Sequence, residues 1–268
     1  MKQLLFDLRT SRPYKFCRML FYYLFEYQKR NARVRARETG ADTTCAYLRK
    51  YRDIHKGQRC FIVATGPSLT AEDLELIRNE YTIGVNALCM KFKEMNWKTS
   101  YFVISDPAAY TRLSPVLKDC RMPFFSAYRD EAEDDGCIYV PTDLHNSYMV
   151  DYNKKEFRKN IELGIGNGNT VVIHAIQIAA YMGFKEIYLL GVDCNYDLTQ
   201  KKLYFVDHGI RGAEQKSAGE RMIADFASLK RYEDQWGLRI YNATRGGMLE
   251  VFPRVKLEEV IKAEASHE

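Results

Sequence analysis

The sequence has no apolar run long enough to cross a membrane, no CxxC cysteine pair, no low-complexity tract and no internal repeat. The longest uncharged stretch near its N-terminus, Met19 to Phe25, is far below the ~20 residues of a membrane span, and no small-residue cleavage site follows it. We therefore expect a chain that neither spans a membrane nor is exported. The seven cysteines are odd in number and scattered, which indicates a reducing, cytoplasmic compartment without structural zinc.

Basic charge is concentrated at the N-terminus. Residues 1–40 carry ten Lys or Arg against three Asp or Glu, a net +7, so the rest of the chain sums to −2. Aromatic and aliphatic side chains are interleaved with these cations, which predicts an amphipathic helix at the inner face of an anionic membrane or against a membrane-bound partner. The alternative is a helix packed on the domain or on another subunit of a homo-oligomer. Because the rest of the chain offers no basic groove, we expect no nucleic-acid partner.

We expect residues 1–58 to form this arm and a polar connector, and residues 59–268 to form one domain. Its first motif is the apolar run 61–64, typical of a strand buried on both faces of a parallel sheet. The run stops at a turn made of Thr65, Gly66, Pro67 and Ser68. A helical pattern follows, so the turn predicts a helix start whose N–H groups face a phosphate, or else an ordinary strand-to-helix turn.

Polar residues also end the next two predicted strands. Asn86 follows a strand over 81–85, and Ser105 with Asp106 follows a strand over 101–104. Ligands of open parallel sheets bind beyond the carboxyl ends of the strands, so we expect these residues to share one crevice with the glycine turn. For Asn86 a simple turn-forming role is the alternative.

A second glycine-rich segment, residues 164–170, precedes a helix predicted over 171–182 and includes Asn169 and Thr170. It is a second candidate cradle for an anion or a sugar. The strand predicted over 185–193 ends in Asp193, and this helix-strand unit indicates the α/β class. We expect a mainly parallel Rossmann-like sheet with helices on both faces.

The remaining segments are predicted more coarsely. Residues 141–165 have little periodicity and are expected to form a loop or lid, as are residues 194–219, which contain Tyr196, Tyr204 and His208. A helix is predicted over 218–235, a last strand over 238–243, and a helical tail from residue 256. His174, inside an apolar helix, is expected to be a packed core histidine.

These motifs resemble a family that groups bacterial lipooligosaccharide sialyltransferases, the related domain of flagellin-modifying motility factors and archaeal hydroxymethylpterin diphosphokinases. The resemblance runs through most of residues 60–255. It rests on Gly66-Pro67-Ser68-Leu69, Asn86, Ser105-Asp106, the unit from Ala175 to Asp193, and Ile240-Tyr241-Asn242-Ala243. It implies a single-domain variant of the glycosyltransferase A fold.

In the sialyltransferases of that family the glycine turn and the asparagine hold a cytidine nucleotide, and two tyrosines bind its phosphate. Tyr196 and Tyr204 stand in comparable places here. The chain departs from the family at Thr65, where those enzymes have asparagine, and it lacks their histidine base, near whose position Glu220 falls. His208, twelve residues earlier, is the other candidate base, with a pKa range suited to proton uptake near neutrality.

Three functions follow from these residues. The first is transfer of a sialic-acid-like sugar from a CMP-activated donor to a cell-surface glycan or glycolipid acceptor at the membrane, with no required cofactor. The second is a Mg²⁺-dependent diphosphokinase, in which Asp106 and Asp193 would hold the ion. The third is a nucleotide-binding or assembly protein without catalysis.

Overall fold

The computed structural model of the chain describes residues 11–127, 136–149, 151–195, 204–206 and 216–265. A seven-stranded sheet, parallel throughout, forms its centre, with strand order β5-β4-β3-β2-β1-β8-β9. These strands are β1 (Arg59–Val63), β2 (Thr82–Val85), β3 (Tyr101–Ile104), β4 (Phe124–Ser126), β5 (Cys137–Tyr139), β8 (Glu186–Leu190) and β9 (Arg239–Asn242). The predicted α/β class with a parallel sheet is confirmed.

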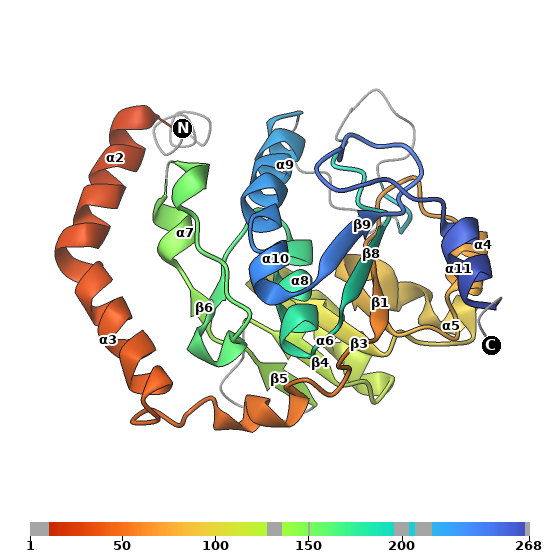
Figure 1. Cartoon of the computed structure of the whole chain (residues 1–268), viewed down its shortest axis with the longest axis horizontal. Coiled ribbons are helices and arrows are strands. Elements are labelled where there is room, and N and C mark those ends of the chain that lie inside the picture. The colour runs from red at the N-terminus through yellow and green to blue at the C-terminus, as the bar shows by residue number, and fades with distance from the viewer. Residues whose placement is uncertain (1–10, 128–135, 150, 196–203, 207–215, 266–268) are drawn as a thin grey trace.

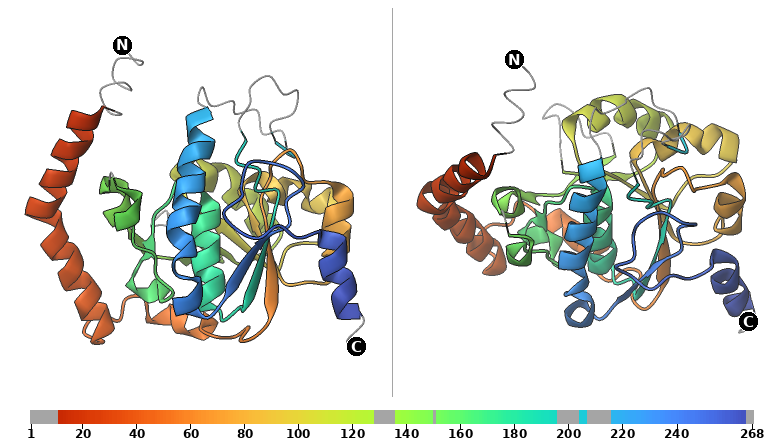
Figure 2. Two further views of the ribbon diagram at one scale, coloured as in Figure 1. Left: turned by 45° about the horizontal axis from the view of Figure 1, so that its top comes forward. Right: turned by 90° about the horizontal axis from the view of Figure 1, so that it is seen from above.

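Helices cover both faces of the sheet (Figures 1 and 2). One face carries α8 (Val171–Tyr181), α9 (Lys216–Lys230) and α10 (Glu233–Trp236). The other carries α4 (Ala71–Leu76), α5 (Phe92–Met95), α6 (Pro107–Asp119) and α11 (Leu257–Ala265), with η3 (Asn86–Lys91) beside them.

Strand β1 shows why the sheet needs both layers. Cys60 and Ile62 belong to the hydrophobic cluster under α8, whereas Phe61 and Val63 belong to the cluster on the opposite face. Successive side chains of a strand point to opposite faces, so an unbroken apolar run is buried on both sides. Helix α8 is itself buried along its whole length.

His174 of α8 is a packed core histidine, as the sequence indicates. It is 2% exposed, and within the described part of the chain neither ring nitrogen has a hydrogen-bond partner. Burial disfavours the charged ring and lowers the pKa of His174 to about 4. The imidazole is therefore neutral at physiological pH and acts as a core side chain.

The N-terminal arm is helical and runs along one side of the domain (Figure 1). It consists of α2 (Arg12–Phe21), a five-residue π-helical turn η1 (Tyr22–Glu26) and α3 (Tyr27–Glu38). The prediction of a helical arm is confirmed for residues 12–38, and residues 1–10 lie outside the described part. Among the described residues, no helix has both the length and the apolar character needed to cross a membrane.

The sequence predicted a polar connector, but the structure shows that part of this connector is buried in the core. It contains η2 (Ala46–Tyr51), and its residues Cys45, Leu48 and His55 are buried. Leu48 is fully enclosed in the core cluster on the α8 face. The polar composition of residues 41–58 does not reveal this burial, because three side chains, those of Cys45, Leu48 and His55, are enough to pack a short segment against the core.

The described residues 141–149 and 151–165 form short regular elements, whereas the sequence predicted a loop or lid. They contain β6 (Thr142–Asp143), α7 (His145–Tyr148), η4 (Tyr152–Lys154) and η5 (Ile161–Leu163), and β6 pairs with β7 (Ile165–Gly166) in a small parallel sheet. The buried Asn146 side chain donates to the carbonyl oxygens of Glu156 and Asn167 and accepts from the Glu156 N–H. Buried polar side chains, which a periodicity argument does not detect, thus fix this segment together with its buried apolar residues Phe157, Ile161 and Ile165.

Candidate functional site

A small pocket opens beyond the carboxyl ends of β1, β2 and β8. Its cavity has a volume of about 50 Å³. The residues expected there on sequence grounds that do line it are Thr65, Gly66, Pro67, Asn86, Thr170, Asp193 and Tyr204. Residues from two separate glycine-rich segments therefore meet at one place, beside the start of α8.

The glycine turn is held against the end of β8 by close backbone contact. The Gly66 N–H donates to the Gly191 carbonyl oxygen at 2.8 Å, and the Ala64 N–H donates to Leu190 at 2.9 Å. A Cβ on Gly66 would lie 1.9 Å from Asp193 Oδ2 and 2.5 Å from the Gly191 oxygen. A Cβ on Gly191, whose φ is +64°, would lie 2.8 Å from the Ala64 oxygen. Both glycines are required by this contact.

The variant Gly66→Ala is therefore expected to lose about 1–3 kcal/mol of unfolding free energy, as overpacked sites do, and to distort the pocket. The measurement is the free energy of unfolding in urea. Gly40→Ala is the control: at φ +77° it carries backbone strain, but no atom lies within 4 Å of the added Cβ. An unchanged free energy of unfolding in Gly66→Ala would show that the contact with Asp193 does not make Gly66 necessary; Gly40→Ala reports the cost of backbone strain without a contact.

Asp193 connects three loops of the site. Its Oδ2 accepts from Ser68 Oγ at 2.8 Å, and its carbonyl oxygen accepts from the Met248 N–H at 2.7 Å. Burial raises the pKa of Asp193 above its ordinary value, and the hydrogen bond from Ser68 opposes that rise. Ser68 thus acts through the carboxylate and is not itself among the described residues that line the pocket.

The second glycine-rich segment is fixed by a buried ion pair. The Thr170 side chain caps α8 by accepting from the Val172 N–H. Just before it, both the backbone N–H and the side-chain amide of Asn169 donate to Asp225 Oδ2 at 2.6 Å. Asp225 is fully buried on α9, and its other oxygen pairs with Lys155 Nζ. The position of the loop therefore depends on a carboxylate from a distant helix.

Asn86 and Tyr204 complete the rim. Asn86 has a φ of +57°, a conformation that asparagine tolerates better than most residues, so the turn-forming role is real and does not conflict with its place at the pocket. Beside Tyr204, the Phe205 N–H donates to the Thr65 carbonyl oxygen at 2.8 Å. Burial raises the pKa of Tyr204, so its hydroxyl is protonated and can donate.

The glycine turn, residues 65–68, differs from the prediction in one respect: it does not lead directly into a helix. Helix α4 begins only at Ala71, where Thr70 and Asp73 form a capping box. The Thr70 side chain accepts from Asp73 N and the Asp73 side chain accepts from Thr70 N, each at 3.1 Å. Pro67 is therefore in a loop and not in the first helical turn, and the start of α4 faces its own cap instead of the pocket. Helix α8 supplies the helix start at this site.

Ser105 and Asp106 do not belong to the described lining of the pocket. Asp106 caps α6, where its Oδ1 accepts from the Ala109 N–H at 2.8 Å. It follows β3, and Asp193 follows β8, with β2 and β1 in between. Three strand spacings of about 4.8 Å separate the two carboxylates by roughly 14 Å, so they cannot ligate one Mg²⁺ ion together.

Of the two candidate bases, the structure describes Glu220 but not His208. His208 and Tyr196 lie outside the described residues. Glu220 is exposed on α9, whereas Met222 of the same helix lines the pocket. Residues two apart on a helix point about 200° away from each other, so Glu220 is turned away from the pocket in this conformation.

Sequence reasoning did not find several lining residues: Gly191, Val172, Cys194 and Met222. Cys194 is buried with a φ of +51°, and burial raises the pKa of its thiol to about 12. The thiol is thus un-ionised and unsuited to nucleophilic attack. Gly191 is the one that could have been predicted, because a glycine two residues before Asp193 marks a strand end that another chain segment approaches.

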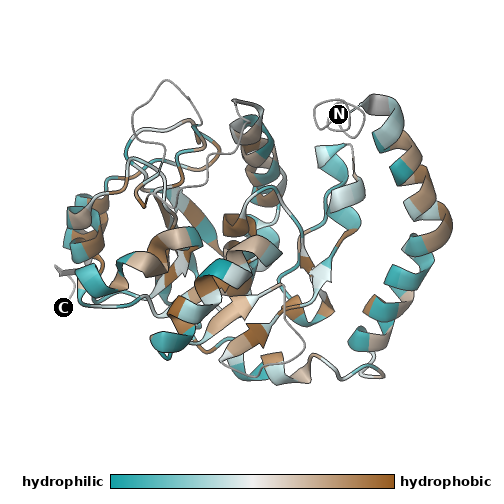
Figure 3. Cartoon of the chain, turned by 180° about the vertical axis from the view of Figure 1, so that it is seen from behind, coloured by the Kyte–Doolittle hydropathy of each residue, from teal (hydrophilic) through white to brown (hydrophobic). Residues whose placement is uncertain are grey.

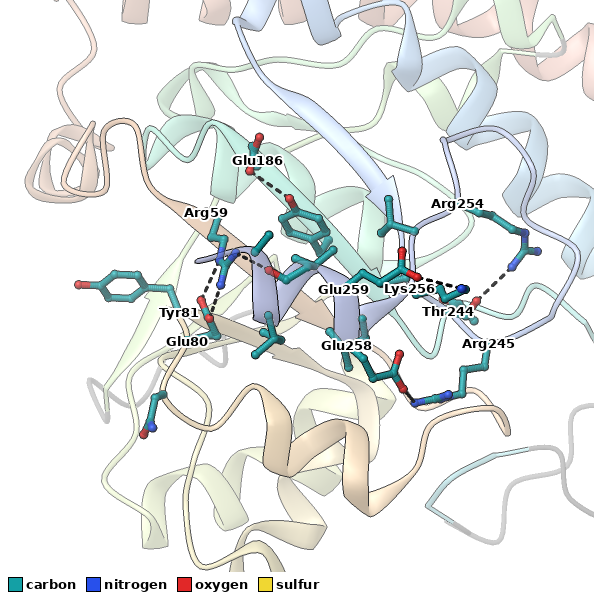
Figure 4. A pocket seen from close by; sticks show the side chains of 18 of the residues that line it. Arg59, Glu80, Tyr81, Glu186, Thr244, Arg245, Arg254, Lys256, Glu258 and Glu259 are labelled. Carbon is teal, nitrogen blue, oxygen red and sulfur yellow. Dashed lines mark hydrogen bonds and ion pairs between the residues drawn. The ribbon is translucent and has the colours of Figure 1, made fainter. Parts of the chain in front are cut away.

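A larger groove lies between α11 and the strands β1 and β8, and residues 243–246, which follow β9, also line it (Figure 4). Its charged side chains pair with one another: Arg59 with Glu80, Arg245 with Glu258, and Lys256 with Glu259. Arg254 donates to the carbonyl oxygens of Thr244 and Gly246. Because these cations are already engaged, the smaller strand-end pocket is the better candidate for binding a phosphorylated ligand.

The parallel sheet, the helices on both its faces and a pocket at the carboxyl ends of its strands define an α/β protein of the Rossmann-like type. A family model described as "6-hydroxymethylpterin diphosphokinase MptE-like" matches residues 39–199. The chain belongs to this MptE-like family. The match covers the glycine turn, Asn86, the second glycine-rich segment and Asp193.

A solved structure, the MAf glycosyltransferase from Magnetospirillum magneticum AMB-1, has the same fold over 81% of this chain, with a TM-score of 0.51 and 18% identity. The chain corresponds to only 39% of the length of that protein. No curated protein matches the sequence. The suspected relationship to motility-associated factors and diphosphokinases is thus confirmed at the level of family and fold.

Proposed function

We propose that this protein is a glycosyltransferase that uses a nucleotide-sugar donor, a CMP-linked sialic-acid-like sugar, and transfers the sugar to a cell-surface glycan or glycolipid. The observation that carries the proposal is the meeting of the Gly66 turn, Asn86 and Thr170 at one pocket; Asn169, beside Thr170, is not among the described lining residues. The fold shared with a glycosyltransferase supports it.

Each group has a role in this proposal. The acceptor hydroxyl loses its proton to the imidazole of His208 while its oxygen forms a bond to the anomeric carbon of the donor. The bond from that carbon to the phosphate oxygen breaks, and CMP leaves. The start of α8 at Thr170 and the hydroxyls of Tyr196 and Tyr204 stabilise the leaving phosphate. Asn86 contacts the nucleotide through its amide.

The cavity constrains how a donor binds. A volume of about 50 Å³ is well below the ~300–1,000 Å³ of a typical ligand pocket, so it takes a fragment of the donor. A whole nucleotide requires the rim to open. Tyr204, from the segment after β8, and Met222 of α9 also line the pocket, and we expect these two side chains to move on binding.

A Mg²⁺-dependent diphosphokinase is the second candidate, favoured by the description of the matching family model. It would bind ATP with Mg²⁺ at the same strand ends. Asp106 and Asp193 would then serve separate ions or separate roles, because two strands lie between them.

The two functions differ in the ligand that stabilises the protein. We expect CMP without Mg²⁺, at about 100 times its Kd, to add about 2.7 kcal/mol of unfolding free energy and to raise the Tm by roughly 5–10 °C. The measurement is thermal unfolding with CMP, CDP, UDP, GDP and ATP, each with and without Mg²⁺. A shift with ATP and Mg²⁺ alone would favour the diphosphokinase, and no shift with any of them would favour a protein without nucleotide chemistry.

A further inference from the structure

The arm helix α2 and the π turn η1 carry their apolar side chains on the side that faces away from the domain. The largest of these are between 48% and 62% exposed: Phe16, Leu20, Leu24 and Phe25. Figure 3 shows apolar residues along the outer edge of this helix. A helix that merely packed on its own domain would turn this face inward. We call these four residues the outer apolar face.

The orientation of the arm is fixed by contacts on its inner side. Tyr22 is 2% exposed, stacks on Tyr148 with ring centroids 4.6 Å apart, and shares a hydrogen bond of 3.0 Å with His145. Burial raises the pKa of the Tyr22 hydroxyl to about 12.

About two helical turns further along, charged side chains contact the domain on the same inner side. Arg30 donates to Asp143 Oδ2 through both Nε and Nη2 and also pairs with Glu156. Asp143 and Arg30 are both largely buried, and removal of one buried charge would leave the other unpaired. These contacts hold the polar side of the arm against the domain and keep the outer apolar face in solvent.

Cations flank the outer apolar face. Lys15, Lys29, Arg33 and Arg35 are exposed on the arm, while Arg30 and Arg37 are engaged with the domain. The acidic residues of the described arm are Glu26 and Glu38, and Glu26 pairs with Lys29. The surface is therefore apolar in the middle and positive at its margins.

We propose that the outer apolar face docks on an anionic lipid surface, with its aromatic and leucine side chains in the interface and its cations on lipid phosphates. A second copy of the chain is a poorer occupant. A symmetric contact would place the same face against itself and bring these cations together. This proposal concerns lipid binding and does not depend on the reaction assigned to the strand-end pocket.

The arm also lies at the end of the molecule where the strand-end pocket opens. In Figures 1 and 2 (left), α2 lies at the same end of the molecule as the carboxyl ends of the strands, where the strand-end pocket opens. A chain docked through α2 would hold that pocket near the lipid headgroups. An acceptor carried on a lipid would then reach the pocket without leaving the membrane.

Co-sedimentation of the full chain with vesicles tests the proposal. We expect binding to equimolar phosphatidylglycerol and phosphatidylcholine, and much weaker binding to phosphatidylcholine alone. The variant Phe16→Ser/Leu20→Ser/Leu24→Ser should bind at least about a hundredfold more weakly, because three large side chains no longer enter the interface. The matched control, Ile54→Ser/Leu76→Ser/Met90→Ser, changes three apolar residues of similar exposure, 40–47%, elsewhere and should bind as the wild type does.

Charge is tested separately with Lys29→Gln/Arg33→Gln/Arg35→Gln. Each cation near an anionic surface changes affinity about fivefold, so this variant should bind about a hundredfold more weakly. Three results would overturn the proposal. The first is that the wild-type protein does not bind the vesicles. The second is that the Phe16/Leu20/Leu24 variant binds them as tightly as the wild type. The third is a wild-type dimer in size-exclusion chromatography that the Phe16/Leu20/Leu24 substitutions convert to a monomer. Thermal unfolding of each variant confirms that it is folded, and none of these readouts depends on CMP.

Discussion

The variant His208→Ala is expected to bind CMP as tightly as the wild type while releasing CMP from a CMP-linked sugar about 10²- to 10⁴-fold more slowly. Loss of a general base removes proton transfer in the transition state and leaves ground-state binding of the nucleotide unchanged. The measurement pairs steady-state turnover of CMP-N-acetylneuraminic acid, in the presence of a glycan acceptor, with calorimetric titration of CMP. The pH profile should also lose the limb that reports ionisation of the base.

Glu220→Gln is the discriminating variant. Glu220 stands near the position of the histidine in the family and is exposed on α9, turned away from the pocket. We expect this variant to keep nearly full turnover. Full activity of His208→Ala together with loss of activity in Glu220→Gln would reverse the assignment and would require α9 to rotate in the bound state.

Replacing Asp225 with leucine is expected to cost about 3–5 kcal/mol of unfolding free energy. Asp225 is fully buried, and its removal leaves the Lys155 ammonium, 6% exposed, without its counter-ion. The same change takes away the acceptor of both Asn169 donors, so affinity for CMP should fall as well. Urea unfolding and CMP titration measure the two effects separately.

The double variant Lys155→Met/Asp225→Leu separates charge from loop placement. With both ions removed, no unpaired charge remains buried, and most of the lost stability should return. Affinity for CMP should stay low, because Asn169 still lacks its acceptor. A double variant as unstable as Asp225→Leu would show that the buried charge of Lys155 is not the source of the cost.

The parallel sheet could be predicted because its strands are visible in the sequence as short apolar runs. Phe61 to Val63, and likewise the strand before Asp193, are apolar runs closed by glycine or a polar residue, and such runs fit only strands buried on both faces. The meeting of Gly66 and Asp193 followed from the rule that ligand sites form at strand ends. What the pattern could not give was the strand order, which separates Asp106 from Asp193.

The contacts that position the second glycine-rich segment and the arm could not be predicted, because they join segments far apart in the sequence. The Asp225 carboxylate fixes Asn169 across fifty-six residues, and Arg30 reaches Asp143 across 113. No local periodicity encodes such pairs. The start of α4 was missed for a local reason: Pro67 suits a first helical turn, but the capping box of Thr70 and Asp73 satisfies the helix start more completely. The outward orientation of the arm likewise came from its inner contacts and not from its composition.

The central claim is that the strand-end pocket binds the nucleotide of the donor, and a calorimetric titration of CMP tests it most directly. The titration compares the wild type, Gly66→Val in the strand-end pocket and Lys256→Ala in the larger groove of Figure 4. We expect CMP to bind the wild type and Lys256→Ala equally and to show no measurable binding to a folded Gly66→Val. Binding that survives in Gly66→Val and disappears in Lys256→Ala would place the nucleotide in the larger groove and contradict the claim.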